Sequence, residues 1–115
     1  MRRIQGFVQL PANVMAGTSG EVTVELRDIS EQDAPSVLLA SVQLPSQALK
    51  AAAQLPFEMH APEADPRRLL SLRVQIAAGP SAGRVRDTVF LSTQNNPVAS
   101  QGDVLNAQAA VTKVS

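Results

Sequence analysis

Few side chains in this 115-residue chain have the chemistry of a catalyst. His60 is the only histidine, and the chain contains no cysteine. A Ser-His-Asp arrangement would have to use His60 as its base, but no nucleophile motif lies near it in the sequence. We interpret His60, at the end of a predicted strand and before a proline-containing loop, as exposed or structural. The sequence predicts no catalytic residue and no enzyme activity.

Acidic residues gather in two loops, where metal binding is the alternative to a role in turns. Asp28, Glu31 and Asp33 lie close together, and loops rich in carboxylates can hold Ca²⁺. Their spacing lacks the pattern of a calcium loop, whereas aspartates that bond nearby backbone commonly end strands. Residues 63–68 combine two acids with two arginines, which predicts a local ion pair of small value if exposed. We predict no metal site and no cofactor.

Asp87 is the charge whose environment is hardest to assign. If the alternation of residues 84–91 holds, Asp87 points inward with Val85 and Val89, and a buried carboxylate needs a partner. A β-bulge would instead turn it outward. We favour a structural role, with Asp87 bonded to backbone or to an arginine. The glycine-rich residues 79–83 just before it lack the lysine and the following helix of a phosphate-binding loop.

Composition restricts the kinds of partner. Ten basic and ten acidic residues cancel, so the chain lacks the positive footprint of a nucleic-acid-binding protein. Three Phe, no Tyr and no Trp leave no stacking platform for bases or sugars. No apolar stretch approaches the ~20 residues of a membrane-spanning helix, and the first residues alternate like a mature domain rather than a signal peptide. We expect one domain over residues 1–115.

The apolar residues follow the pattern of β-strands. Val22, Val24 and Leu26 alternate with polar residues, which is the period of a strand with one buried face. The same period returns between loops rich in proline and glycine, and it predicts seven strands. These cover residues 3–10, 21–29, 37–44, 55–59, 69–77, 84–91 and 103–114. Because no helix is long enough to cross between parallel strands, we expect an all-β, antiparallel β-sandwich of about seven strands, with a small β-barrel as the alternative.

Three segments carry further expectations. Residues 37–44 are apolar on both faces, which indicates either a strand buried on both sides at one end or a partner-binding face. Residues 45–54 contain strong helix formers but are too short for a helix that is stable alone, so they form a single helical turn or an extended loop. Pro56 cannot donate to a strand ladder, so strand 55–59 lies at an edge or starts at this proline.

Several short motifs occur in a fixed order between residues 20 and 92. They are Val22-Thr23-Val24-Glu25-Leu26-Arg27-Asp28-Ile29-Ser30, Asp33-Ala34-Pro35, Leu55-Pro56-Phe57-Glu58, Asp65-Pro66-Arg67, Leu72-Arg73-Val74-Gln75-Ile76 and Asp87-Thr88. In this order the motifs resemble a family of bacterial lipoproteins. That family includes the type III secretion pilotins of the YscW kind and lipoproteins of the YbaY kind.

The resemblance implies an exported protein, acylated on an N-terminal cysteine and held on the periplasmic face of the outer membrane. It implies a pilotin, which binds the C-terminal tail of a secretin and helps it reach and assemble in the outer membrane. The cysteine that would carry the lipid is missing from this sequence. The alternative is a general envelope lipoprotein without a secretin partner. We expect a monomer with no nucleic-acid partner.

A pilotin needs an apolar groove or a sheet edge that accepts a short amphipathic tail. The outward apolar residues are candidates for this contact, although each of them suits a core equally well. They are Phe7, Val37, Leu39, Leu69 and Phe90. The edge strand near Phe57 offers a second route, by strand addition.

Overall fold

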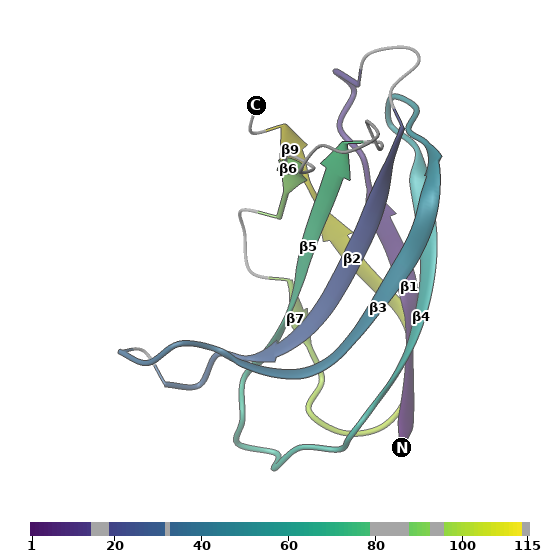
Figure 1. Cartoon of the computed structure of the whole chain (residues 1–115). Coiled ribbons are helices and arrows are strands. Elements are labelled where there is room, and N and C mark those ends of the chain that lie inside the picture. Colours follow the sequence, from purple (N-terminus) through teal and green to yellow (C-terminus); the bar gives the residue numbers. More distant parts are fainter. Residues whose placement is uncertain (15–18, 32, 79–87, 93–95, 114–115) are drawn as a thin grey trace.

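Strands arranged in two stacked sheets make up the computed structural model, which describes residues 1–14, 19–31, 33–78, 88–92 and 96–113 (Figure 1). The strands are β1 (Arg2–Gln9), β2 (Ser19–Asp28), β3 (Val37–Ala48), β4 (Gln54–Ala61), β5 (Leu70–Ala78), β6 (Thr88–Leu91), β7 (Pro97–Val98), β8 (Val104–Ala110) and β9 (Thr112–Lys113). Asp87, Val85 and the glycine-rich residues 79–83 lie outside the described residues.

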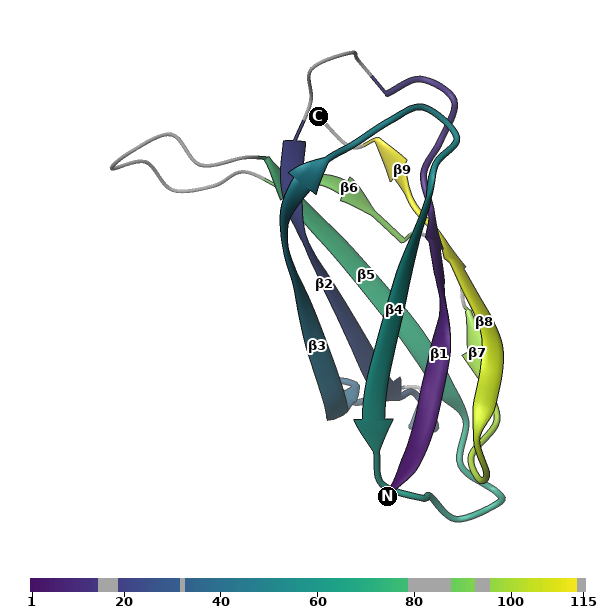
Figure 2. The same cartoon turned by 90° about the vertical axis from the view of Figure 1, so that its right-hand side faces the viewer.

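The small sheet has the strand order β4-β1-β8, and the large sheet has the order β3-β2-β5-β6-β9, with β7 paired to β5. Figure 2 views the molecule from the side of the small sheet, with the large sheet behind it. The predicted β-sandwich is confirmed. In the described part of the chain the two sheets stay separate and close no barrel.

Alternation along the strands fills the space between the sheets. The predicted inward rows of β2 and β5, residues 22–26 and 70–76, are buried at every second position, as is the row of β1 from Ile4 to Val8. These side chains belong to one aliphatic cluster to which both sheets contribute. Burial of this apolar surface is the main favourable term in folding, so the two-residue period of the sequence correctly predicts most of the core.

The expectation of wholly antiparallel sheets is wrong for one pair, because β8 runs parallel to β1. The predicted last strand, residues 103–114, is also divided between the sheets. Its first part, β8, pairs with β1, and its last part, β9, pairs with β6 of the large sheet. Val111 is buried at the crossing, and its amide donates to the carbonyl of Gln9 at 3.1 Å.

The prediction of a helical turn or an extended loop over residues 45–54 is wrong for their first part, because β3 continues to Ala48. A register shift against β2 falls at Pro45 and Ser46, so the proline sits in a bulge of an edge strand, where it costs least. Pairing with β2 supplies backbone hydrogen bonds that a short isolated helix could not hold. A turn follows, closed by the amide of Ala53 on the carbonyl of Lys50 at 3.1 Å.

The edge strand predicted from the sequence can be located, and the structure adds a second one. β4 is an edge strand of the small sheet, as Pro56 indicated. β3 is an edge strand of the large sheet, and Val37 and Leu38 at its start are about half exposed. The interpretation of residues 37–44 as buried on both faces at one end is therefore wrong.

The buried Arg2 holds the N-terminal end of the sandwich. Its Nε donates to the carbonyl of Pro62 at 3.3 Å, and its Nη1 donates to the carbonyls of Ala99 and Gly102. These contacts tie the start of β1 to the loops before β5 and β8. In the described ranges there is no helix that is long and apolar enough to cross a membrane.

Candidate functional site

The five apolar residues predicted for partner binding do not form one surface. Phe7 lies on the outer face of the small sheet and is 37% exposed. Val37 and Leu69 are more than half exposed, but they lie at the ends of strands of the large sheet. Leu39 is partly buried against the core, and Phe90 is 2% exposed. Only Phe7, Val37 and Leu69 are thus freely accessible to a partner.

The expectation that Phe90 points outward is wrong. In the pairing of β5 with β6, Ile76 opposes Phe90, whereas the next residue Ala77 opposes Thr88. The skipped residue forms a bulge, and one extra residue reverses the alternation of side chains. Phe90 therefore shares the inward face of Ile76 and belongs to the core.

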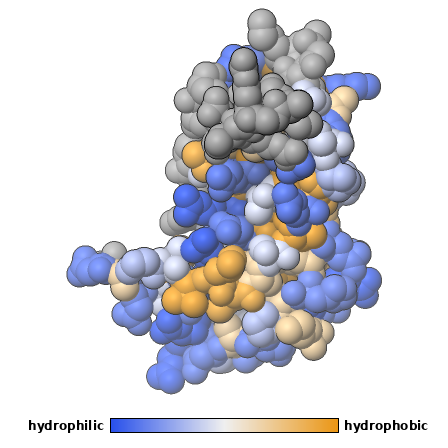
Figure 3. All heavy atoms as spheres, in the orientation of Figure 1, coloured by the Kyte–Doolittle hydropathy of each residue, from blue (hydrophilic) through white to orange (hydrophobic). Residues whose placement is uncertain are grey.

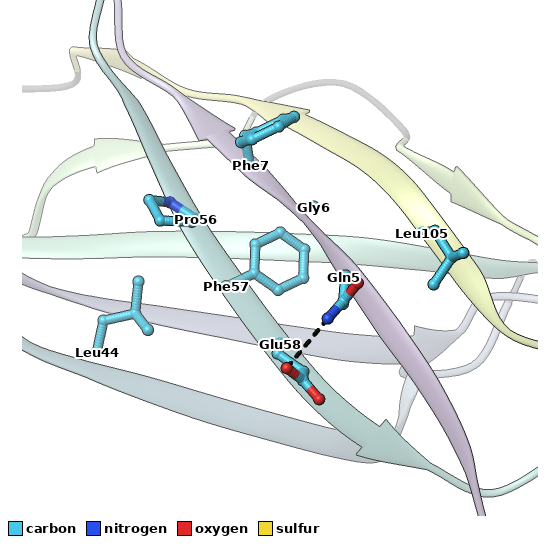
Figure 4. A pocket seen from close by; sticks show the side chains of 8 residues that line it. All are labelled: Gln5, Gly6, Phe7, Leu44, Pro56, Phe57, Glu58 and Leu105. Carbon is cyan, nitrogen blue, oxygen red and sulfur yellow. Dashed lines mark hydrogen bonds between the residues drawn. The ribbon is translucent and has the colours of Figure 1, made fainter.

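A groove of about 450 Å³ opens at the small sheet (Figure 4). Its apolar side chains include Phe7 of β1, Pro56 of β4 and Leu105 of β8. Phe7 and Pro56 are direct neighbours across the ladder, as are Gln5 and Glu58. The Gln5 amide donates to the Glu58 carboxylate at 3.1 Å, so one polar pair lies beside the apolar wall.

Two local irregularities give the groove its shape. Ile4 opposes Val104 and Gly6 opposes Ala107, so β8 carries an extra residue between these pairs. This bulge turns Leu105 outward, to 64% exposure, although simple alternation predicts that it shares the inward row of Ala107. At Gly6 a Cβ atom would collide with the backbone carbonyl of Ala107, so only glycine lets β8 pack this closely.

Leu105 and Pro56 are two of the apolar groove residues that the sequence did not identify. Leu105 carries no local signal, because its orientation depends on a register between strands about 100 residues apart in the chain. Pro56 is visible in the sequence as a marker of an edge strand, and the structure adds that its ring faces the groove (Figure 4).

A second, smaller hollow of about 240 Å³ lies where β5 begins. Ile29, Leu69 and Pro97 line it, together with Arg68. An apolar patch is visible low on the face that β2, β3 and β5 present (Figure 3). This hollow shares no lining residue with the groove of the small sheet.

Asp28 closes the corner after β2. Its Oδ1 accepts the amide of Ser30 at 2.9 Å, and its Oδ2 accepts Nε of Arg68 at 2.7 Å. Hydrogen bonds from Ser30, through its hydroxyl and its amide, and then from Arg68 lower the pKa of Asp28 from 3.8 to about 2. The Ser30 hydroxyl also accepts the amide of Leu69 at 2.8 Å.

The conspicuous acids of this motif therefore act in the scaffold. Arg68 reaches Glu31 at 3.4 Å as well as Asp28, so the two arginines of residues 63–68 have different acidic partners. Arg67 pairs locally with Asp65 at 3.5 Å, as predicted. Within the described ranges, no group of three or more potential ligands could hold a metal ion.

His60 is exposed on the outer face of β4, where its Nε2 lies 3.8 Å from Oε1 of Glu58. The neighbouring outward residues of this strand are Glu58 and Pro56, which line the groove. The groove of the small sheet therefore presents an apolar surface with one carboxylate beside it. Such a surface is suited to binding a segment of another chain.

Comparison with known proteins identifies a family and a similar fold. The sequence profile of the YscW family, described as type III secretion system lipoprotein chaperones, matches residues 1–110. The fold is similar to the structure of an alternative pilotin from the type II secretion system of Vibrio cholerae. The TM-score is 0.73 at 18% sequence identity, over 99% of this chain and 97% of that chain. No curated protein sequence matches the chain. The chain belongs to the YscW family of type III secretion system lipoprotein chaperones.

Proposed function

We propose that this protein is a pilotin that binds the C-terminal tail of a secretin. In this proposal it helps the secretin reach and assemble in the outer membrane for type III secretion. A lipid on an N-terminal cysteine upstream of these residues would hold it on the periplasmic face of that membrane. The proposed activity is binding by a monomer, and it needs no catalytic residue and no cofactor.

The observation that carries the proposal is the groove at the small sheet, in a member of a family of secretion chaperones. Phe7 and Leu105 are apolar, accessible and held by two different strands of one sheet. Apolar residues that a folded chain leaves exposed in a groove commonly mark an interaction site. Val37 and Leu69 lie outside this groove, and Leu39 and Phe90 pack with the core, so we retain Phe7 from the sequence-based set.

Isothermal calorimetry with the C-terminal peptide of the secretin from the same genome tests the proposal. We expect saturable binding that Phe7→Ser and Leu105→Ser each weaken about tenfold or more, because each change removes apolar contact area. Leu38→Ser is the matched control, since Leu38 is similarly exposed on the large sheet and outside the groove.

A wild-type protein that gives no heat with the peptide would overturn the secretin proposal and favour a general envelope lipoprotein. Equal loss of affinity in all three variants would place the tail outside the groove. Labelling of the full-length protein with radioactive palmitate tests the proposed anchor separately, because a protein without the lipidated cysteine would incorporate none.

A further inference from the structure

We propose that Glu58 makes the groove selective for an amphipathic helix that carries a lysine or arginine beside its apolar stripe. The inference deepens the proposed function and rests on it. It concerns which tails the groove accepts, and three features of the small sheet support it.

The first feature is that Phe7, Pro56 and Leu105 project from the outer face of the small sheet, although β4 and β8 are the edge strands of that sheet. β1, which crosses the floor of the groove, is paired with β4 on one side and with β8 on the other. The backbone groups of β1 are therefore already hydrogen-bonded, and the outer backbone groups of β4 and β8 lie in the plane of the sheet. A segment that lies over the face of the sheet finds side chains but few free amides or carbonyls. Such a segment must satisfy its own backbone hydrogen bonds, which a helix does and an extended strand does not.

The second feature is the spacing of the side chains. Phe7 and Pro56 face each other on adjacent strands, which lie about 4.8 Å apart. Glu58 follows Pro56 by two residues on β4, or about 7 Å along the strand. Apolar residues at i and i+4 of a helix are about 5–6 Å apart, so one stripe can cover the apolar wall. Glu58 lies to the side of this cross-strand line, so a residue on the flank of the helix, beside the stripe, comes close to it.

The third feature is the charge of Glu58. Its side chain is 45% exposed and accepts a hydrogen bond from the neutral amide of Gln5 at 3.1 Å, and Nε2 of His60 lies 3.8 Å from its carboxylate. Across the described residues it forms no ion pair with a lysine or arginine within 4.0 Å. Arg3 opposes His60, which lies two residues beyond Glu58 on β4. A helix that covers the groove would partly desolvate this carboxylate, which favours a cation at that point of the partner.

The large sheet provides a matched control. Gln43 donates to the carboxylate of Glu21 at 3.1 Å, which is the same kind of cross-strand pair as Gln5 with Glu58. Glu21 does not line the groove. Glu58→Gln and Glu21→Gln both keep an acceptor for the neighbouring amide and remove one negative charge, and thermal unfolding should show both variants folded.

Calorimetry with the same secretin peptide compares these variants at low and high salt. We expect Glu58→Gln to raise the Kd about 2- to 5-fold at low salt and less at high salt, as for an exposed ion pair. Glu21→Gln should leave the Kd unchanged. Glu58→Lys should weaken binding further, and a peptide whose lysine or arginine is replaced by glutamate should restore it.

Two results would overturn the inference while leaving the proposed function intact. One is binding by the wild type that Glu58→Gln and Glu21→Gln leave equally unchanged. The other is a peptide that binds in the groove but carries no lysine or arginine. Absence of binding by the wild type would overturn both proposals.

Discussion

At the residue scale, Asp28 combines a turn hydrogen bond with an ion pair, and the two can be separated. Asp28→Asn keeps an oxygen for the Ser30 amide but removes the charge that faces Arg68 at 2.7 Å. We expect the variant to lose about 1 kcal/mol of unfolding free energy, measured by urea denaturation. Asp65→Asn is the control, because Asp65 has the same turn bond and ion pair with Arg67 at a more exposed place. Its expected loss is about 0–0.5 kcal/mol.

The same carboxylate predicts a pH dependence. The pKa of Asp28 is lowered to about 2 in the folded state, so the unfolded chain binds this proton more readily. The stability from Asp28 is therefore complete above its ordinary pKa of 3.8 and is lost as the pH falls through about 2. The difference in unfolding free energy between wild type and Asp28→Asn should shrink from about pH 5 to about pH 2. A difference that stays constant over this range would contradict the assignment.

Ala52 adopts a positive φ of 58° in the turn after β3. This left-handed conformation costs an L-residue about 1–2 kcal/mol, whereas glycine adopts it freely but loses about 0.4–1 kcal/mol through its larger unfolded-state entropy. Ala52→Gly should therefore stabilise the protein by roughly 0.5–1 kcal/mol, seen as a higher Tm. Ala51→Gly, next to it and without a positive φ, should lower the Tm. Equal Tm shifts in both variants would contradict the backbone strain assigned to Ala52.

At the element scale, Gly6 controls how closely β8 lies on β1. A methyl group there would meet the carbonyl of Ala107, so one strand must move. We expect Gly6→Ala to cost about 3 kcal/mol in chemical denaturation. Gly102→Ala is the comparison, since Gly102 has a φ of 79° but open space around its Cβ position, and it should cost about 1–2 kcal/mol. If Gly6→Ala costs no more stability than Gly102→Ala, then β8 moves away from β1 at little cost.

Bulges mark the limit of what alternation can predict for single elements. The inward rows of β1, β2 and β5 follow directly from the sequence, because these strands pair regularly there and one face meets the core. Simple alternation places Leu105 and Phe90 on the wrong face, since each lies next to a register shift. A bulge depends on how a partner strand fits, and the local sequence does not encode it.

At the scale of the whole molecule, the C-terminal segment joins the two sheets. β8 belongs to the small sheet, β9 belongs to the large sheet, and Val111 is buried between them. A chain that ends at Ala110 should lose about 2–4 kcal/mol of unfolding free energy, because a buried valine and the pairing of β9 are gone. A chain that ends at Lys113 keeps these contacts and should unfold like the full chain. Identical urea midpoints for the two truncations would contradict this role.

The sequence alone determined the class of the fold, the aliphatic core and the motifs of the family, because strand period and turn chemistry are local properties. It also predicted Phe7 as an outward apolar residue. Only the tertiary structure decided that Phe7 meets Pro56 and Leu105 in one groove with Glu58 beside them. These residues come from three strands far apart in the chain, and their meeting depends on a parallel pairing, a bulge and a close approach at Gly6. Such contacts arise from packing between distant segments, which no local pattern specifies.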